Sequence, residues 1–362
     1  MLLDLSIELR LILSITTSLL LALLLKYPIH YVAIKKECLE KENGRTSHKG
    51  KIPNLGGAMI YFSFLTSSLL FVKFAAADLQ YVFLSFSVLF ALGFYDDVIV
   101  ISYRKKFQGE FVGAVLLIIG NVYLTNFHGL FGFHQLSLYF SIPFTIIMIL
   151  GIVNAMNLID GIDGLCSGLS ALIIASFSLW LFNNGFIEYG IVGFSLTAAI
   201  IPFFVFNVFG KKTKMFLGDN GSLFLGMVIS FLVIKFCELN IGNNSWQNVQ
   251  NAPAIAFTII AIPVLDTLRV FVTRILNKKS PYRPDKTHFH HKFLEYYDGN
   301  HKKATFTIIG IQLLFIILAF CGSSLPGEAL ITISIVLFLA FYFGIIFLIA
   351  RKRKNVVKAV YD

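Results

Sequence analysis

Residues 329–350 read ALITISIVLFLAFYFGIIFLIA, and the basic run Arg351-Lys352-Arg353-Lys354 follows directly. The apolar stretch has no charged side chain, and it exceeds the roughly 18 residues that a helix needs to cross the hydrocarbon core of a bilayer. Basic residues concentrate in the cytoplasmic segments of membrane proteins. Together the two features predict a membrane-spanning helix whose carboxyl end lies in the cytoplasm.

The rest of the chain has the same apolar character. Of its 362 residues, 57% are hydrophobic and 14% are charged, against about 45–50% and about 25% in soluble domains. This composition excludes a soluble globule and a disordered chain. We predict an all-α integral membrane protein with about eleven transmembrane helices, residues 1–362 forming a single polytopic membrane domain. The predicted spans are 5–25, 54–73, 79–96, 110–126, 138–156, 165–182, 188–208, 220–239, 252–273, 304–322 and 329–350.

The charges of the connecting segments assign the two sides of the membrane. One set contains 26 of the 30 lysines and arginines. This set comprises the loops 26–53, 97–109, 157–164, 209–219 and 274–303 and the tail after 350. The other side carries only Arg10 and Lys73. By the positive-inside rule the amino terminus is outside and the carboxyl terminus is cytoplasmic. The net charge of +10 has the same explanation, so we expect no nucleic-acid partner.

Polar residues collect at the predicted cytoplasmic ends of the spans, and we expect these five loops to form an active site. Ionisable residues at membrane depth are costly and tend to mark function. In KIPNLGG, residues 51–57, Lys51 could contact a phosphate, whereas Pro53 could mark a simple helix entry. Asp96 and Asp97 end the third span, where they could bind a divalent cation, accept a proton or form a solvated helix end.

The segment NAMNLIDGIDG is the strongest single indication of function. It places Asn154, Asn157, Asp160 and Asp163 at every third position. Its two glycines predict that the helix unwinds near Asp160. An unwound segment with free carbonyls and carboxylates suits a metal or a polar ligand.

Two further segments carry acids and histidines. Asp219 in FLGDNGS lies at a predicted helix start, where it could cap the helix or bind Mg²⁺. Asp266 and Arg269 are spaced to form an ion pair on one helix. The loop PYRPDKTHFHH, residues 281–291, has three histidines within four residues. Zinc lacks a clear further ligand set there, so hydrogen bonds to a diphosphate are the better interpretation.

These parts combine into one chemistry. Asp and Asn oxygens suit Mg²⁺, basic groups lie on several loops, and all of them face the membrane surface on the cytoplasmic side. A metal ion that bridges phosphate oxygens neutralises the charge that develops in phosphoryl transfer. The residues therefore predict phosphoryl transfer between a soluble nucleotide-linked donor and a lipid acceptor.

The motifs KIPNLGG, FYDD, NAMNLIDGIDG, FLGDNGS, PVLDTLR and PDKTHFHH occur in this order. As a set they resemble the polyprenyl-phosphate N-acetylhexosamine-1-phosphate transferases, the family of MraY, WecA and TagO, from about residue 45 to 295. The loop PDKTHFHH is similar to the P-D-x-x-H-x-H-H of WecA/TagO-type enzymes, with Phe289 where isoleucine is commoner. MraY tends instead to a compact run of three histidines.

The resemblance implies a reaction and a set of site residues. UDP-GlcNAc and undecaprenyl phosphate would give undecaprenyl-diphospho-GlcNAc and UMP, the first membrane step of a cell-surface polysaccharide or teichoic acid. Mg²⁺ or Mn²⁺ would be the cofactor, held by Asn157 and Asp219. Asp96, Asp97, Asp160 and Asp163 are the predicted catalytic residues. Lys51, Asn154, Arg283, Asp285, His288, His290 and His291 are the predicted substrate-binding residues.

The resemblance also implies a bacterial plasma membrane location with the active site facing the cytoplasm, and family analogy allows a homodimer. Two alternatives stay open. The first is the same chemistry with another donor, such as UDP-MurNAc-pentapeptide. The second is a secondary transporter with a broken helix at Gly161–Gly164. A transporter predicts polar groups near the bilayer midplane and internal repeat symmetry, and the sequence has neither.

Overall fold

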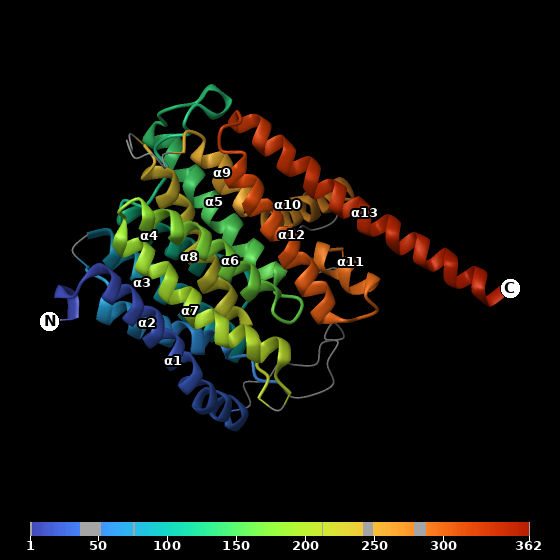
Figure 1. Cartoon of the computed structure of the whole chain (residues 1–362), viewed down its shortest axis with the longest axis horizontal. Helices are drawn as coiled ribbons and strands as arrows, with labels where there is room; N and C mark the ends of the chain where they lie inside the picture. The colour runs from blue at the N-terminus through green and yellow to red at the C-terminus, as the bar shows by residue number, and fades with distance from the viewer. Residues whose placement is uncertain are drawn as a thin grey trace.

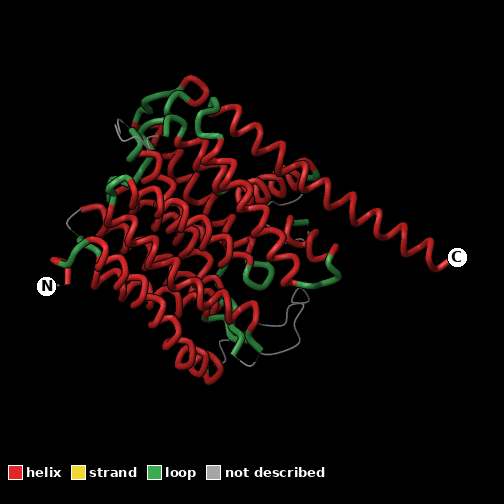
Figure 2. Tube along the Cα trace, in the orientation of Figure 1, coloured by secondary structure: helices red, strands yellow, loops and turns green. Residues whose placement is uncertain are grey.

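The computed structural model describes residues 2–36, 52–74, 77–211, 213–241, 249–278 and 287–361. These ranges form a helical bundle (Figures 1 and 2), with an isolated β-bridge between Asn126 and Gln135 and no strand among the described residues. The long helices are α1 Ile7–Lys35, α2 Gly56–Phe71, α3 Ala77–Ile99, α4 Tyr103–Ile119, α5 Leu138–Ile159, α6 Leu165–Asn183, α7 Ile187–Phe209, α8 Gly218–Glu238, α10 Ala261–Leu276, α12 His301–Cys321 and α13 Gly327–Tyr361. The short ones are η1 Leu2–Asp4, η2 Leu130–Gly132, α9 Ala252–Ile259 and α11 Phe289–Tyr296.

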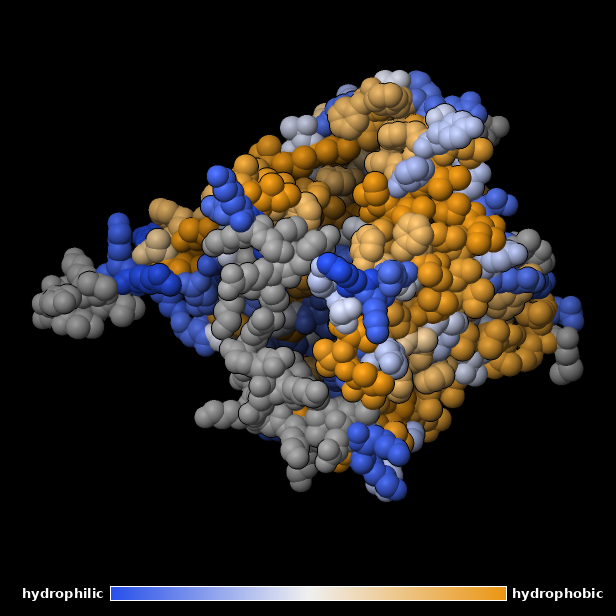
Figure 3. Space-filling view, turned by 180° about the vertical axis from the view of Figure 1, so that it is seen from behind, coloured by the Kyte–Doolittle hydropathy of each residue, from blue (hydrophilic) through white to orange (hydrophobic). Residues whose placement is uncertain are grey.

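The predicted class, an all-helical multi-pass membrane protein, is confirmed. Among the described residues, eight helices are long and apolar enough to cross a membrane, and the bent pair α9–α10 would make a ninth. Apolar side chains cover much of the exposed bundle face in Figure 3, as lipid contact requires. Each of the eleven predicted segments overlaps a helix, but α2 has only 16 residues and α4 only 17. The count of eleven and the orientation of the termini therefore stay predictions.

Helix α4 is displaced from its predicted position. The apolar pattern placed a span at 110–126, whereas the helix runs from Tyr103 to Ile119 and a loop follows Gly120. Hydropathy misses the first turns because they carry Arg104, Lys105 and Lys106. Arginine and lysine are good helix formers, so the helix starts in this charged segment and brings it to the bundle.

Helix α8 is the centre of the bundle. Its apolar part is buried throughout, and it packs against α2, α3, α5, α6 and α9. A helix that is apolar on all sides is stable only when other helices surround it. In Figure 1 it lies behind α7 and between α3 and α5, and its amino-terminal end, at Gly218 and Asp219, is half-buried.

A proline breaks the predicted span 252–273 into α9 and α10, which meet at an angle of 78°. Pro263 has no N–H to donate to the carbonyl of Ile259 four residues earlier, which is the usual cause of a sharp kink. The side chain of Gln312 on α12 donates to that carbonyl instead, at 2.7 Å. The bend turns α10 across the bundle (Figure 1) and sets the direction of the polar segment that follows.

An ion pair between Arg10 and Glu188 connects the helices at the end of the bundle where α1 and α7 begin. Arg10 donates to both carboxylate oxygens of Glu188, at 2.8 and 3.1 Å, and to the carbonyl of Phe71 at the end of α2. The backbone N–H of Lys73 also donates to Glu188, at 2.7 Å. The motif residues lie at the opposite helix ends.

The bend at Pro263 generates the first test. Gln312→Leu leaves the Ile259 carbonyl buried without a donor, so we expect it to lower the free energy of unfolding by about 1–3 kcal/mol. In a Pro263→Ala background the new backbone N–H can serve the same carbonyl. There Gln312→Leu should cost less than half as much, measured by thermal unfolding in detergent. Equal costs in the two backgrounds would contradict this account of the bend.

Candidate active site

Asp97 holds the amino-terminal end of α8. Its carboxylate accepts hydrogen bonds from the backbone N–H groups of Asp219 and Asn220, at 3.0 and 2.9 Å. The side-chain amides of Asn220 and Asn54 donate to the same carboxylate. A carboxylate at this position satisfies N–H groups that have no partner within the helix and interacts favourably with the helix dipole. The structure therefore uses Asp97, one of the predicted catalytic residues, to position Asp219.

Glycines let two other helices approach this end of α8. A Cβ atom on Gly93 of α3 would overlap the carbonyl of Asp219, and one on Gly57 of α2 would overlap the backbone of Gly221. The backbone N–H groups of Gly56 and Gly57 donate to the carbonyls of Phe216 and Leu217, each at 2.9 Å. The glycines of KIPNLGG thus serve the packing of α2 against the segment before α8.

Lys106 joins two of the predicted acids. Its ammonium lies 2.6 Å from the carboxylate of Asp219 and 3.1 Å from that of Asp96. Asn157, at the end of α5, donates to the other oxygen of Asp219 at 2.6 Å and to the hydroxyl of Ser222 at 2.9 Å. The side chain of Asp219 keeps 32% of its surface exposed, so a ligand can reach it. Residues from α3, α4, α5 and α8 thus meet at one point, and we call Asp96, Lys106, Asn157 and Asp219 the acid cluster.

Glu110 lies one helical turn beyond Lys106 and is almost fully buried, with 1% of its surface exposed. It accepts a hydrogen bond of 2.6 Å from the side-chain amide of Asn154. That amide also donates to the carbonyl of Leu150. Asn154, predicted to bind substrate, therefore lies deeper than the acid cluster and connects α5 to α4.

The turn between α5 and α6 carries the other two predicted acids. Helix α5 ends at Ile159, Asp160 follows as its C-cap, and α6 begins after Gly164 with a left-handed backbone, which confirms the predicted unwinding near Asp160. Asp163 forms an ion pair of 2.6 Å with Lys214 and lies 3.5 Å from His301. It therefore belongs to a second charged group at the same end of the bundle.

Asp266 holds the start of the histidine segment, which comprises residues 288–291. It pairs with Arg269 at 2.7 Å, as the sequence predicted, and with Nδ1 of His288 at 2.9 Å. Its other bond comes from the backbone N–H of Phe289 at 3.0 Å, at the start of α11. The broken span thus places α10 where one buried carboxylate fixes both the first histidine and the short helix that carries the others.

His290 is buried in contact with the turn between α5 and α6. Its ring lies where a Cβ on Gly161 would be, so only glycine fits at that position. Neither ring nitrogen has a hydrogen-bond partner among the described residues. Burial, together with the neighbouring His291 ring at 4.2 Å between centroids, holds the pKa of His290 well below its usual range. His290 is therefore neutral at pH 7 and links α11 to the acid-bearing turn.

Three predicted site residues cannot be placed, and three residues near the site were not predicted. Lys51, Arg283 and Asp285 lie outside the described residues. Lys106, Glu110 and His301 were not among the predicted site residues. For Lys106 and Glu110 an available signal was their spacing of four on a helix that begins directly after the Asp96-Asp97 pair.

Asn157 and Asp219 fit a divalent ion whose coordination shell would be completed by a substrate. Within the described ranges, no three His, Cys, Asp or Glu side chains are grouped to hold a metal ion by themselves. Asn157 and Asp219 nevertheless place an amide and a carboxylate in contact. Mg²⁺ typically takes one or two carboxylates and completes its shell with waters and substrate phosphates. The described residues thus suit a shared site better than a closed protein cage.

Fold and site together define the class. The sequence profile of glycosyl transferase family 4 matches residues 79–237, which contain the whole acid cluster and the turn with Asp163. The undecaprenyl-phosphate alpha-N-acetylglucosaminyl 1-phosphate transferase of Escherichia coli O157:H7 is 31% identical over 265 residues, which are 72% of this chain and 70% of the relative. The chain belongs to glycosyl transferase family 4, which confirms the predicted resemblance.

Other relatives extend the match. The enzyme of the same name from Yersinia pestis is 30% identical over 272 residues, 72% of this chain and 70% of the relative. The probable undecaprenyl-phosphate N-acetylglucosaminyl 1-phosphate transferase of Bacillus subtilis (strain 168) is 27% identical over 311 residues, covering 86% of this chain and 84% of the relative. These names agree with the WecA/TagO type that the loop PDKTHFHH predicts.

The cap on α8 generates a stability test. Asp97→Ala should lower the free energy of unfolding by about 1–2 kcal/mol, because a helix loses its N-cap acceptor. Asp97→Asn keeps one acceptor oxygen but places an NH₂ group against the donors of the other, so it should also lose stability, though less than Asp97→Ala. Thermal unfolding in detergent measures both, and a wild-type melting temperature for Asp97→Ala would refute the capping role.

His290 generates a pH test. In the unfolded chain its pKa is about 6.5, whereas in the folded protein it is lower. Below about pH 6.5 the unfolded state therefore binds more protons, so stability is full above this pH and falls as the pH drops toward the folded-state pKa. His290→Phe should flatten the fall in melting temperature between pH 7.5 and 5. His134→Gln, in an exposed loop, should keep the wild-type slope, and an unchanged slope for His290→Phe would exclude its buried ring as the cause.

Proposed function

We propose that this protein transfers N-acetylglucosamine 1-phosphate from UDP-N-acetylglucosamine to undecaprenyl phosphate, giving undecaprenyl-diphospho-N-acetylglucosamine and UMP. The names of the relatives support undecaprenyl phosphate as the acceptor and N-acetylglucosaminyl 1-phosphate as the group transferred. One observation of the structure supports it most, the acid cluster of Asp96, Lys106, Asn157 and Asp219. The cluster lies at the ends of membrane-spanning helices, where a lipid phosphate and a soluble nucleotide can meet.

The bond changes follow from the two substrates. A phosphate oxygen of the lipid attacks the phosphorus that carries the sugar, a new P–O bond forms, and the bond from that phosphorus to the bridging oxygen breaks. UMP leaves with the bridging oxygen. Phosphoryl transfer of this kind depends mainly on positioning and on neutralising charge. The protein must therefore hold two anions together and compensate their repulsion.

The acid cluster provides groups for both tasks. Lys106 carries a positive charge between two carboxylates, and it is placed to contact phosphate oxygens when these displace a carboxylate. Asp96 is our candidate for the group that accepts a proton from the lipid phosphate, because it lies against Lys106 in the acid cluster. Asp97 instead accepts four hydrogen bonds that hold the amino terminus of α8. Asp219 and Asn157 would hold Mg²⁺ or Mn²⁺. When bound, such an ion neutralises the charge on the donor diphosphate.

The segment with His288, His290 and His291 is our candidate for the binding site of the donor. His288 and His291 lie next to His290, with ring centroids 5.7 and 4.2 Å from it. Asp266 fixes the orientation of His288. Lys214 and His301 add further basic groups around Asp163. We assign this side to the sugar diphosphate and the acid cluster to the metal and the lipid phosphate, in a bacterial plasma membrane with the site facing the cytoplasm.

The reaction and its donor can be tested together. Purified protein in detergent with undecaprenyl phosphate is offered UDP-GlcNAc, UDP-GalNAc or UDP-MurNAc-pentapeptide, and UMP release is followed with Mg²⁺, with Mn²⁺ and with EDTA. We expect metal-dependent and lipid-dependent UMP from UDP-GlcNAc. UMP from another donor alone would keep the chemistry and change the sugar. No UMP from any donor, together with flux of an unmodified substrate into proteoliposomes, would favour the transporter alternative.

Lys106 provides a matched pair of variants. Lys106→Met should lower kcat about 10²–10³-fold, the usual loss when a charge stabiliser is removed from an active site. Lys105 is the adjacent residue on α4 and is exposed, so Lys105→Met should keep kcat within about twofold. Asp219→Asn should lose activity as Lys106→Met does and should require more Mg²⁺. Similar activity for Lys106→Met and Lys105→Met would remove Lys106 from the mechanism.

A further inference from the structure

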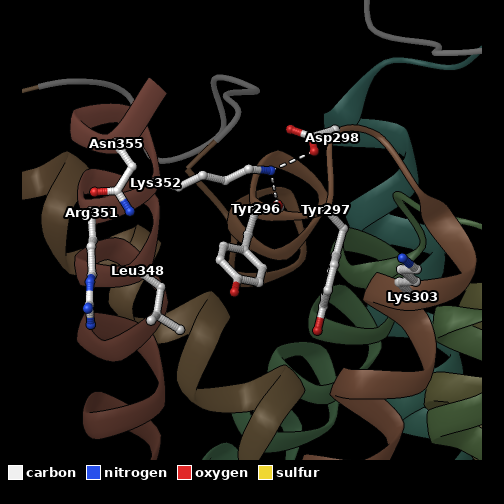
Figure 4. A pocket seen from close by; sticks show the side chains of 8 residues that line it. All are labelled: Tyr296, Tyr297, Asp298, Lys303, Leu348, Arg351, Lys352 and Asn355. Atoms are coloured by element: carbon white, nitrogen blue, oxygen red, sulfur yellow. Dashed lines mark hydrogen bonds and ion pairs between the residues drawn. The ribbon is translucent and has the colours of Figure 1, made fainter. Parts of the chain in front are cut away.

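A pocket of about 540 Å³ lies apart from the acid cluster, where α13 passes the end of α11 and the start of α12. It is lined by Tyr296, Tyr297, Asp298, Lys303, Leu348, Arg351, Lys352 and Asn355. Figure 4 shows the two tyrosine rings side by side in the middle, with Arg351 and Asn355 on α13 to one side and Lys303 to the other. Lys352 reaches over the tyrosines toward Asp298.

The lining of the pocket has an excess of positive charge. It includes three basic side chains and a single carboxylate. That carboxylate, Asp298, pairs with Lys352 at 2.6 Å. Lys303 and Arg351 are exposed, and Figure 4 shows them on opposite sides of the two tyrosines. These two further cations, on different helices around one hollow, favour an anionic ligand.

The position along α13 indicates what kind of anion. The uncharged stretch 329–350 ends one residue before Arg351, so the pocket lies at the boundary between membrane and water. Leu348 supplies an apolar floor, and tyrosines prefer this boundary because they are apolar with a polar tip. Basic groups that directly follow a membrane span attract the anionic lipids of the cytoplasmic leaflet.

We propose that this pocket binds the phosphate headgroup of an anionic phospholipid, with Lys303 and Arg351 as its cationic contacts. The pocket shares no residue with the acid cluster, so we assign it to a lipid other than the acceptor. Lys352 and Arg353 already connect α13 to the end of α11, through the Tyr296 carbonyl at 2.9 Å and the Glu295 carboxylate. A bound headgroup adds a bridge between α12 and α13 beside the helix that carries His290.

Native mass spectrometry of the full chain in detergent tests the proposal without using transferase activity. Phosphatidylglycerol and phosphatidylcholine are titrated separately. Lys303→Gln/Arg351→Gln should weaken phosphatidylglycerol binding about tenfold or more, since each basic residue near the surface contributes to attracting the anionic lipid. Lys302→Gln/Lys354→Gln removes the same charge from the same two helices without touching the pocket, and it should change binding less than about twofold. Lys303→Arg/Arg351→Lys should restore wild-type binding.

Three results would overturn the proposal. Equal losses in the two glutamine double variants would mean that only the general charge of the surface matters. Equal binding of phosphatidylcholine and phosphatidylglycerol by the wild-type protein would remove the anionic specificity. Displacement of phosphatidylglycerol by low millimolar inorganic phosphate would assign the pocket to a free anion. All the altered side chains are at least partly exposed, and melting temperatures equal to that of the wild type would confirm that the variants are folded.

Discussion

The amino-terminal end of α8 meets the ends of several other helices, and the geometry of the site depends on how it is held there. Its first N–H groups have no partner within the helix, so another part of the protein supplies an acceptor. Asp97 does so from the end of α3. Gly57 and Gly93 allow α2 and α3 to approach closely enough for this contact. Asp219 is held in place as a result, one residue into a helix that packing prevents from moving.

Cations lie against three of the acids around that point. Lys106 contacts both Asp96 and Asp219, and Lys214 contacts Asp163, at distances of 2.6–3.1 Å. Partly buried acids without such partners would have to lose their charge or move toward water. In the proposed reaction, the same cations would be available to an incoming phosphate. A substrate oxygen would then replace an internal carboxylate contact without exposing a bare charge.

A broken helix supplies the second half of the site. Pro263 interrupts the α9–α10 span, and Gln312 satisfies the carbonyl that the proline leaves free. Backbone that is not helical is tolerated at membrane depth only where such partners exist. The bend carries Asp266 to the start of α11, where it holds His288 and the backbone of Phe289. His290 then rests on Gly161, so the histidine helix and the acid-bearing turn are positioned against each other.

The sequence by itself determined the membrane class, the helical segments, the unwinding at Asp160 and the Asp266–Arg269 pair, because each depends on neighbours within a few residues. It also predicted Asp96, Asn157, Asp163 and Asp219 as site residues, because several polar clusters fall at the cytoplasmic ends of the spans. Only the tertiary structure decided which acid caps α8, that Lys106 joins two carboxylates, and that α9 and α10 bend. Lys106 and Asp219 are 113 positions apart, and no local pattern relates residues that meet only when separate helices pack together.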